Sequence, residues 1–228
     1  MKLLLLLIAS SCLTQVKVES YFGNDYAVAK KKMVIDGKAI SKICNEYEIN
    51  QAIVKSIVFP ELIRNSVFQN LIEEKALELG YVQYGSSIVD FSIGDFQIKP
   101  SFAQKVEELV KASKQLSKKY SLLPIINTNS KTQRLVRVQR LKSVEWQIRY
   151  VCSFIDICEA NYSISKYSTS EKIKFLATAY NVGLKDSMAK IEIYYPIQSF
   201  PYGQKYEIDQ LAYWEVSLDY YLKYSHVL

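Results

Sequence analysis

Apolar residues recur at helical spacing along most of the chain. The pattern predicts a short helix over 39–48, a second helix capped at its start by Asn50, and a third over 68–79 that stops at Gly80. Pro60 falls inside the second helix, where its ring crowds the preceding turn and its nitrogen has no proton to donate. We therefore expect the helix to kink or restart at Pro60, and the residue that follows to face a cleft.

The helical pattern continues through the rest of the chain. Four further helices are predicted, over 100–119, 132–160, 168–179 and 206–221. Pro100 suits the first turn of a helix, and Ser168 with Glu171 has the spacing of a capping box. The stretch 81–95 holds glycine and serine among alternating apolar residues, so it predicts a loop or a small hairpin. Residues 21–36 show no clear pattern.

The composition agrees with a helical domain. The 228 residues are 49% hydrophobic, which is enough for one folded core, and they include only 7 glycines and 5 prolines. So few chain breakers favour long helices over a many-turned β-sandwich. We expect a mostly α-helical single domain over residues 21–228, with a small loop or hairpin beside its cleft.

Residues 1–20 have the pattern of an export signal. Lys2 supplies a positive start and residues 3–9 a short apolar run, which is too short to span a bilayer as a permanent helix. Two processing sites fit the residues. The Ala-Ser-Ser-Cys sequence ending at Cys12 loosely resembles a bacterial lipobox, in which Cys12 would carry a lipid, whereas small residues farther on would allow cleavage before Tyr21. We expect export to the periplasm or cell envelope, with membrane attachment through Cys12 in the first case.

Charge and rare residue types limit the chemistry that the chain can perform. The net charge is +6, but no dense basic run with interleaved aromatics occurs beyond residues 30–32, so we expect no nucleic-acid partner. The single histidine, His226, and the lack of a Cys-x-x-Cys pair argue against a zinc site. The histidine count also leaves no internal histidine for a Ser-His-Asp or Cys-His catalytic unit. We expect a monomer without a metal or cofactor.

Four cysteines are present, at positions 12, 44, 152 and 158. Cys152 and Cys158 lie six residues apart in one predicted helix, so their side chains point to different sides and should not pair. Cys44 could reach either of them, and the alternative is a set of buried, unpaired thiols.

Glu61 is a candidate for acid–base chemistry. It lies in a stretch in which residues 57–59 and 62–63 are all apolar. Burial among apolar neighbours disfavours the charged carboxylate and so raises its pKa. A carboxyl group that holds a proton near neutral pH can deliver it to a leaving group as a general acid. The alternative is an exposed glutamate on a helix surface.

Two downstream stretches resemble motifs of one enzyme family. Residues 92–103 read Ser-Ile-Gly-Asp-Phe-Gln-Ile-Lys-Pro-Ser-Phe-Ala and are similar to the S-x-G-L-M-Q-I-x-P-x-T-A motif of the soluble lytic transglycosylases. Residues 177–183, Ala-Thr-Ala-Tyr-Asn-Val-Gly, are similar to the A-x-A-Y-N-x-G motif of the same family. Glu61 stands where that family has its catalytic glutamate, and the order of the three motifs also matches. The resemblance covers roughly residues 38–185 and implies a lysozyme-like fold.

The resemblance implies cleavage of the β-1,4 bond between N-acetylmuramic acid and N-acetylglucosamine in the glycan strands of peptidoglycan. Glu61 would act as acid and then as base on the sugar's own 6-hydroxyl, giving a 1,6-anhydro product without consuming water. Tyr180 would hydrogen-bond Glu61 and set its orientation and proton affinity. Gly94 would let the backbone approach the sugar closely. The substrate-binding residues would be Ser92, Gly94, Gln97 and Asn181.

The chain also departs from the family pattern. Leu62 follows Glu61 where serine is usual, and Asp95-Phe96 replaces Leu-Met. Asp90 and Asp95 lie on the loop that would face the cleft, and a carboxylate about 5–9 Å from Glu61 would allow ordinary hydrolysis, as in a lysozyme-type muramidase. The alternatives are therefore a hydrolase, or a catalytically inactive cell-wall binding protein on the same fold.

Overall fold

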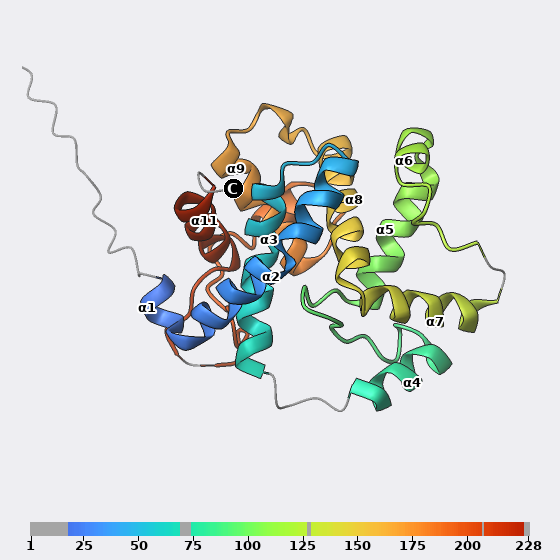
Figure 1. Cartoon of the computed structure of the whole chain (residues 1–228), viewed down its shortest axis with the longest axis horizontal. Helices are drawn as coiled ribbons and strands as arrows, with labels where there is room; N and C mark the ends of the chain where they lie inside the picture. The colour runs from blue at the N-terminus through green and yellow to red at the C-terminus, as the bar shows by residue number, and fades with distance from the viewer. Residues whose placement is uncertain (1–17, 69–73, 127–128, 207, 226–228) are drawn as a thin grey trace, which may run out of the picture.

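Helix α3 (Gln51–Phe68) runs through the middle of the molecule, and most of its residues are buried. The helices packed against it are α2 (Asn24–Glu46), α8 (Val144–Asn161), α9 (Thr169–Val182) and α11 (Tyr213–Tyr224), as Figure 1 shows. The computed structural model describes residues 18–68, 74–126, 129–206 and 208–225. Cys12 and the apolar run of the predicted export signal lie outside the described residues.

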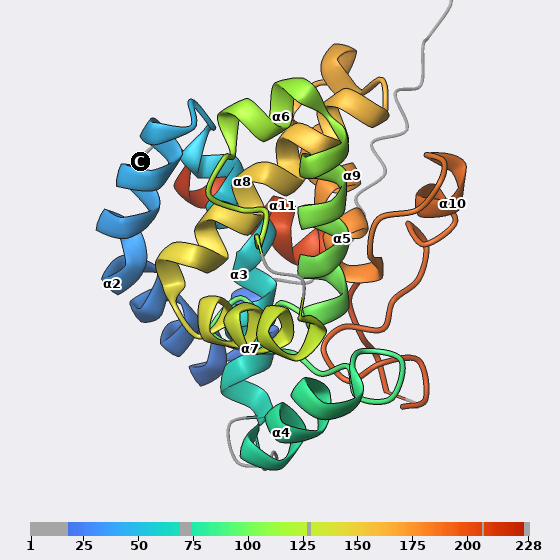
Figure 2. The same ribbon diagram turned by 90° about the vertical axis from the view of Figure 1, so that its right-hand side faces the viewer.

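A second group of helices lies on the side of α8 that faces away from α2 and α3 (Figure 2). Its members are α4 (Glu74–Tyr84), α5 (Pro100–Ala112), α6 (Lys114–Lys119) and α7 (Ser130–Leu141). Helix α5 packs on α8, α7 packs on both of them, and α4 packs on α7. The short elements are α1 (Val18–Phe22) against α2, α10 (Ala189–Glu192) against α9, and a 3₁₀ turn (Ile164–Lys166).

The described residues form a mostly helical single domain, as predicted, and contain no β-strand. The β-type pairing within the described residues consists of two isolated antiparallel bridges, Ile93 with Ile98 and Phe200 with Leu211. The first bridge closes a tight turn in loop 85–99, so the predicted loop or hairpin is a loop. One hydrophobic core joins helices of both groups. None of the helices in the described ranges is long and apolar enough to cross a membrane.

Three predicted helix starts are confirmed. The Asn50 side chain accepts a hydrogen bond from the Ala52 amide at 2.8 Å at the start of α3. Pro100 is the first residue of α5. Ser168 and Glu171 form the reciprocal capping box of α9, with the Glu171 carboxylate accepting from the Ser168 amide at 2.8 Å. At these positions the local chemistry of helix caps decides the structure.

Helix α3 does not restart at Pro60, and α4 does not stop at Gly80, so these two predictions are wrong. Helix α3 continues through Pro60. A proline inside a helix costs about 3 kcal/mol, but residues 54–63 are all buried, and the free energy of their burial outweighs that cost. Helix α4 continues past Gly80, which packs closely on Val89: a Cβ at position 80 would lie 3.1 Å from Cγ2 of that valine.

Two predicted helices are each divided by a serine. The helix predicted over 100–119 is broken at Ser113, whose side chain accepts a hydrogen bond from a backbone amide of α6. The helix predicted over 132–160 is broken at Ser143, which caps α8 in the same way. Hydrophobic periodicity does not register these breaks, because the helices on both sides keep their apolar positions toward the core.

Other predicted boundaries differ more. The predicted helix 39–48 is the end of the longer α2, which covers most of the unassigned stretch before it. The predicted helix 206–221 is replaced by the later α11, because Leu211 pairs with Phe200 in an extended bridge just before it. Phe68, where the predicted helix 68–79 starts, is the last residue of α3, residues 69–73 lie outside the described residues, and α4 begins at Glu74.

Three cysteines are described, and each is a buried free thiol. Cys152 and Cys158 do not pair with each other, as predicted. Cys44 of α2 lies beside Cys152 of α8, where the two helices pack, and forms no disulfide. The alternative of buried, unpaired thiols is therefore the one that the structure supports.

Candidate active site

Glu61 borders a cavity of about 300 Å³ between α3, the loop before α5, the start of α5 and the end of α9. The predicted site residues that line it are Glu61, Asp90, Ser92, Gln97, Tyr180 and Asn181. The rest of the lining comes from Arg64, Lys99, Ser101, Phe102, Lys105 and residues 182–184. The fold thus brings three stretches that are far apart in the sequence to one cavity.

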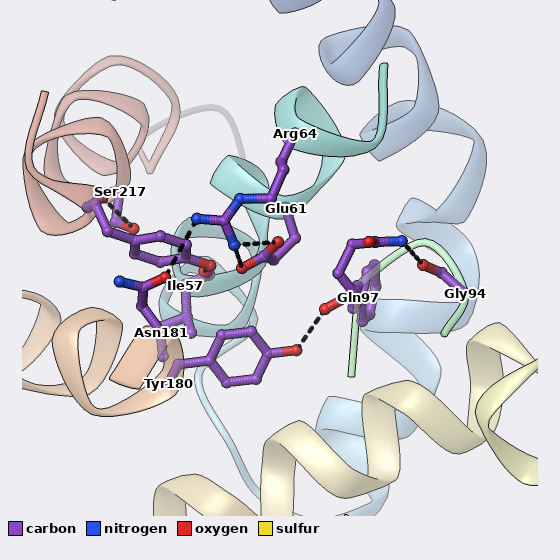
Figure 3. A network of polar contacts seen from close by, with 10 residues as sticks. Ile57, Glu61, Arg64, Gly94, Gln97, Tyr180, Asn181 and Ser217 are labelled. Carbon is purple, nitrogen blue, oxygen red and sulfur yellow. Dashed lines mark hydrogen bonds and ion pairs between the residues drawn. The ribbon is translucent and has the colours of Figure 1, made fainter. Parts of the chain in front are cut away.

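The Glu61 side chain is almost completely buried, because the residue has a relative exposure of 3%. Its two carboxylate oxygens accept hydrogen bonds from Nη1 of Arg64, at 2.8 and 2.9 Å (Figure 3). Burial raises the pKa of Glu61, while the Arg64 charge, the neighbouring Tyr213 hydroxyl and the Lys99 charge oppose that rise. The net direction is upward, as the sequence predicts. The alternative of an exposed surface glutamate is wrong.

Tyr180 does not make the hydrogen bond that the family resemblance implies. Its hydroxyl donates to the backbone oxygen of Phe96 at 2.8 Å (Figure 3), and a phenol has one proton to donate. The ring makes edge-to-face contacts with Phe102 and Phe154, at centroid distances of 5.5 and 5.7 Å. Tyr180 therefore holds the loop against α9 and forms part of the cavity wall, without donating to Glu61.

Gly94 packs against α7 and α8, and it is not among the residues that line the cavity. A Cβ at this position would lie 2.5 Å from the backbone oxygen of Leu141 and 2.3 Å from Nε2 of Gln147, and its φ is +72°. Gln97 lines the cavity, but its Nε2 donates to the Gly94 oxygen at 2.8 Å. The glycine therefore serves the packing of the loop, and the loop in turn orients Gln97.

We expect Gly94→Ala to lower the free energy of unfolding by about 2–5 kcal/mol. A left-handed φ costs a residue with a Cβ about 1–2 kcal/mol, and overlap with fixed neighbours adds about 1–3 kcal/mol. Urea unfolding followed by circular dichroism measures the change. Gly183→Ala is the matched control, because φ is +83° there but nothing lies within 4 Å of the added Cβ. Equal losses in the two variants would show that φ alone requires glycine at position 94.

The two aspartates considered as second carboxylates both have structural partners. Asp90 lines the cavity, and its oxygens accept hydrogen bonds from the Ser101 amide at 3.1 Å and the Ser101 hydroxyl at 2.7 Å, at the start of α5. Asp95 forms an ion pair with Lys32 of α2 at 2.9 Å. Asp95 is therefore held toward α2, whereas Asp90 borders the cavity.

Sequence reasoning missed two residues beside Glu61. Arg64 follows Glu61 by three positions in α3. Because side chains at this spacing lie together on a helix, the sequence could have predicted that the two residues pair. Its guanidinium group also lies over the rings of Phe200 and Tyr213, at 4.9 and 5.7 Å from their centroids. Tyr213 of α11 donates to the backbone oxygen of Ile57 at 2.9 Å and lies beside the Glu61 carboxylate. No local sequence pattern predicts the position of Tyr213.

Amide, hydroxyl and cationic side chains surround the buried carboxyl group. Ser92 and Asn181 line the cavity, and Oδ1 of Asn181 accepts a hydrogen bond from Nη2 of Arg64 at 3.3 Å. Lys99 and Lys105 line it as well. Such a set suits the binding of a polar ligand and proton transfer to it. Within the described ranges, no group of three or more His, Cys, Asp or Glu side chains is placed to hold a metal ion.

A larger cavity of about 710 Å³ borders α5 and α7, and its buried charged groups already have partners. Arg137 donates to both Glu107 oxygens, at 3.0 and 2.6 Å, and to the Tyr81 hydroxyl at 2.7 Å. The Tyr150 hydroxyl donates to Glu107 at 2.6 Å. Because this network is satisfied internally, it is structural, and we place the candidate site at Glu61.

No family model, no curated protein and no solved structure matches the chain. A functional proposal therefore depends on the residues around Glu61 and on the chemistry that they can perform.

Proposed function

We propose that the protein is a peptidoglycan lytic transglycosylase on a lysozyme-like fold, with Glu61 as general acid and base. The observation that carries the proposal is the buried Glu61 carboxyl group, with a raised pKa, on a cavity that Ser92, Gln97, Tyr180 and Asn181 also line. A general acid needs a proton near neutral pH and an opening through which the substrate reaches it. Both features of Glu61 support the proposal.

In the proposed reaction, protonated Glu61 gives its proton to the oxygen of the β-1,4 glycosidic bond as the bond from C1 to that oxygen breaks. The carboxylate then takes the proton of the 6-hydroxyl group, whose oxygen attacks C1 of N-acetylmuramic acid. The product carries a 1,6-anhydro ring, no water is consumed, and Glu61 ends protonated as it began. Ser92, Gln97 and Asn181 would hold hydroxyl or N-acetyl groups of the sugars.

Two observations favour alternatives. Asp90 borders the same cavity as Glu61, which favours a lysozyme-type hydrolase, although Ser101 occupies both Asp90 oxygens. Arg64 bonds both Glu61 oxygens, which favours a wall-binding protein that does not cleave, unless Arg64 moves when a ligand binds.

Mass spectrometry of insoluble peptidoglycan digested by the purified protein tests the three functions. We expect anhydro-muropeptides from a transglycosylase. Release of sugars with reducing ends would identify a hydrolase and make Asp90 the second carboxylate. No release, with the protein sedimenting together with the wall, would identify a binding protein.

We also propose export to the periplasm or cell envelope, with cleavage before Cys12. Val18 and Phe22 of α1 are buried, so cleavage before Tyr21 would remove a core residue, whereas cleavage before Cys12 keeps α1 whole. We expect mass spectrometry of the protein from native envelopes to find a lipid on Cys12. A mature protein that begins at Tyr21 would contradict the processing site, and an intact Met1 in the cytoplasm would contradict export.

A further inference from the structure

Arg64 lies between Glu61 and the solvent side of the cavity. The Arg64 side chain is 26% exposed and that of Glu61 is 4% exposed. Figure 3 shows the guanidinium group between the Glu61 carboxylate and the Asn181 side chain, to which Nη2 donates at 3.3 Å. Its face lies over the Phe200 and Tyr213 rings. In this conformation Arg64 bonds both Glu61 oxygens, which favours the charged carboxylate over the protonated acid.

The charge of Arg64 also acts on the protonation of Glu61. The groups that face this carboxyl group are Arg64 on α3, Lys99 in the loop before α5, Tyr180 on α9 and Tyr213 on α11. Among them the Arg64 charge does most to lower the pKa of Glu61, against burial, which raises it. If Arg64 leaves while Glu61 stays buried, the equilibrium moves toward the protonated form that a general acid requires.

The cavity has cations that a ligand carboxylate could use. Lys99 and Lys105 line it together with Arg64, while Asp90 is already bonded at the start of α5. The planar guanidinium group of Arg64 can donate two parallel hydrogen bonds to a carboxylate. The two lysines attract negative charge to the same cavity. The cavity therefore suits a ligand with an acidic substituent.

We propose that Arg64 is a positioning residue that responds to an acidic substituent of the bound glycan. In the free protein Arg64 bonds Glu61. When a glycan presents a carboxylate, Arg64 transfers its hydrogen bonds to that group, and Glu61 takes a proton from solvent. The inference rests on the proposed function, because the stem peptides of peptidoglycan bear carboxylates next to the sugar that would occupy the cavity. This response of Arg64 gives the site a preference for acidic glycans over neutral polymers of N-acetylglucosamine.

Two matched ligands test the inference on the wild-type chain: muramyl dipeptide, which carries a carboxylate, and its neutral amide. We expect the acid to bind about tenfold more tightly, the size of one charge-assisted hydrogen bond. NMR of protein labelled with ¹³C at glutamate Cδ follows the Glu61 titration. The acid should raise the pKa of Glu61, and the amide should leave it unchanged.

Two variants complete the test. In Arg64→Gln, the pKa of Glu61 should be higher before any ligand is added, and the preference for the acid should fall toward equal binding. Lys172→Gln is the matched control, because it removes the same charge from a pair with Glu159 near the start of α9. The control should behave as the wild type does. The comparison of acid and amide on the wild-type chain does not depend on the folding of any variant.

Failure of this inference and failure of the proposed function give different results. If the wild type releases anhydro-muropeptides but binds acid and amide equally, with no response of Glu61, Arg64 is a fixed part of the site and the inference is wrong. If the acid is preferred and Glu61 responds, yet no glycan is cleaved, the proposed function is wrong, while the inferred response of Arg64 to a carboxylate holds.

Discussion

Glu61→Gln is expected to abolish the release of anhydro-muropeptides from insoluble peptidoglycan while leaving the fold and glycan binding largely intact. Glutamine keeps the size of the side chain and can still accept a hydrogen bond from Arg64, but it has no proton to give at neutral pH. General acid–base assistance is commonly worth about 10²–10⁴-fold. One group would serve both half-steps here, so the loss should lie at the upper end of that range. Mass spectrometry of the digest measures the rate of release.

Two further variants make this result specific. Tyr180→Phe should cost less activity, because the hydroxyl that it removes bonds Phe96 and leaves the acid in place. Asp95→Asn should release product at nearly the wild-type rate, since Asp95 pairs with Lys32 of α2. Full activity in Glu61→Gln would show that the central assignment is wrong.

Arg137→Ala is expected to lower the free energy of unfolding by about 3–5 kcal/mol, the usual cost of leaving a buried charge without its partner. Arg137 is buried, and its Nη2 lies 2.6 Å from Oε2 of the buried Glu107. The substitution also removes the donor to the Tyr81 hydroxyl. Urea unfolding measures the change, and the proposed glycan cleavage near Glu61 should keep its rate wherever the variant is folded.

Lys190→Ala is the control for the Arg137 substitution. Lys190 pairs with Asp186 at 2.7 Å, but the two side chains are 61% and 87% exposed. Exposed pairs are worth about 0–1 kcal/mol, so this variant should unfold nearly as the wild type does. A loss in Arg137→Ala no larger than in Lys190→Ala would show that the buried network contributes little to stability.

Local polar chemistry allowed several helix starts to be predicted, whereas helix lengths depended on packing. The capping box of Ser168 and Glu171 acts within four residues, so it can be recognised in the sequence. Whether Pro60 breaks α3 depends on burial of the surrounding turns by other helices, which no local pattern contains. The serine breaks at Ser113 and Ser143 were local signals too, but the continuous apolar periodicity concealed them.

At the site as well, several residues could be predicted from the sequence, but their hydrogen-bond partners could not. The order of the motifs allowed the gathering of Glu61, Gln97, Tyr180 and Asn181 at one cavity to be predicted. The hydrogen-bond partner of Tyr180 could not be predicted, because it depends on the path of the loop that brings the backbone oxygen of Phe96 within 2.8 Å. The position of Tyr213 beside Glu61 likewise could not be predicted, because it depends on where α11 packs against α3.

The backbone of Phe96 is held from two sides, and this affects how a ligand would bind. Its amide donates to Oε1 of Gln147 at 2.7 Å, and its carbonyl oxygen accepts from the Tyr180 hydroxyl. The loop that carries Gln97 is thus ordered before any ligand arrives, so binding costs little conformational entropy on this side of the cavity. The Phe96 amide should accordingly exchange its hydrogen slowly in the free protein, at a rate that reports global unfolding.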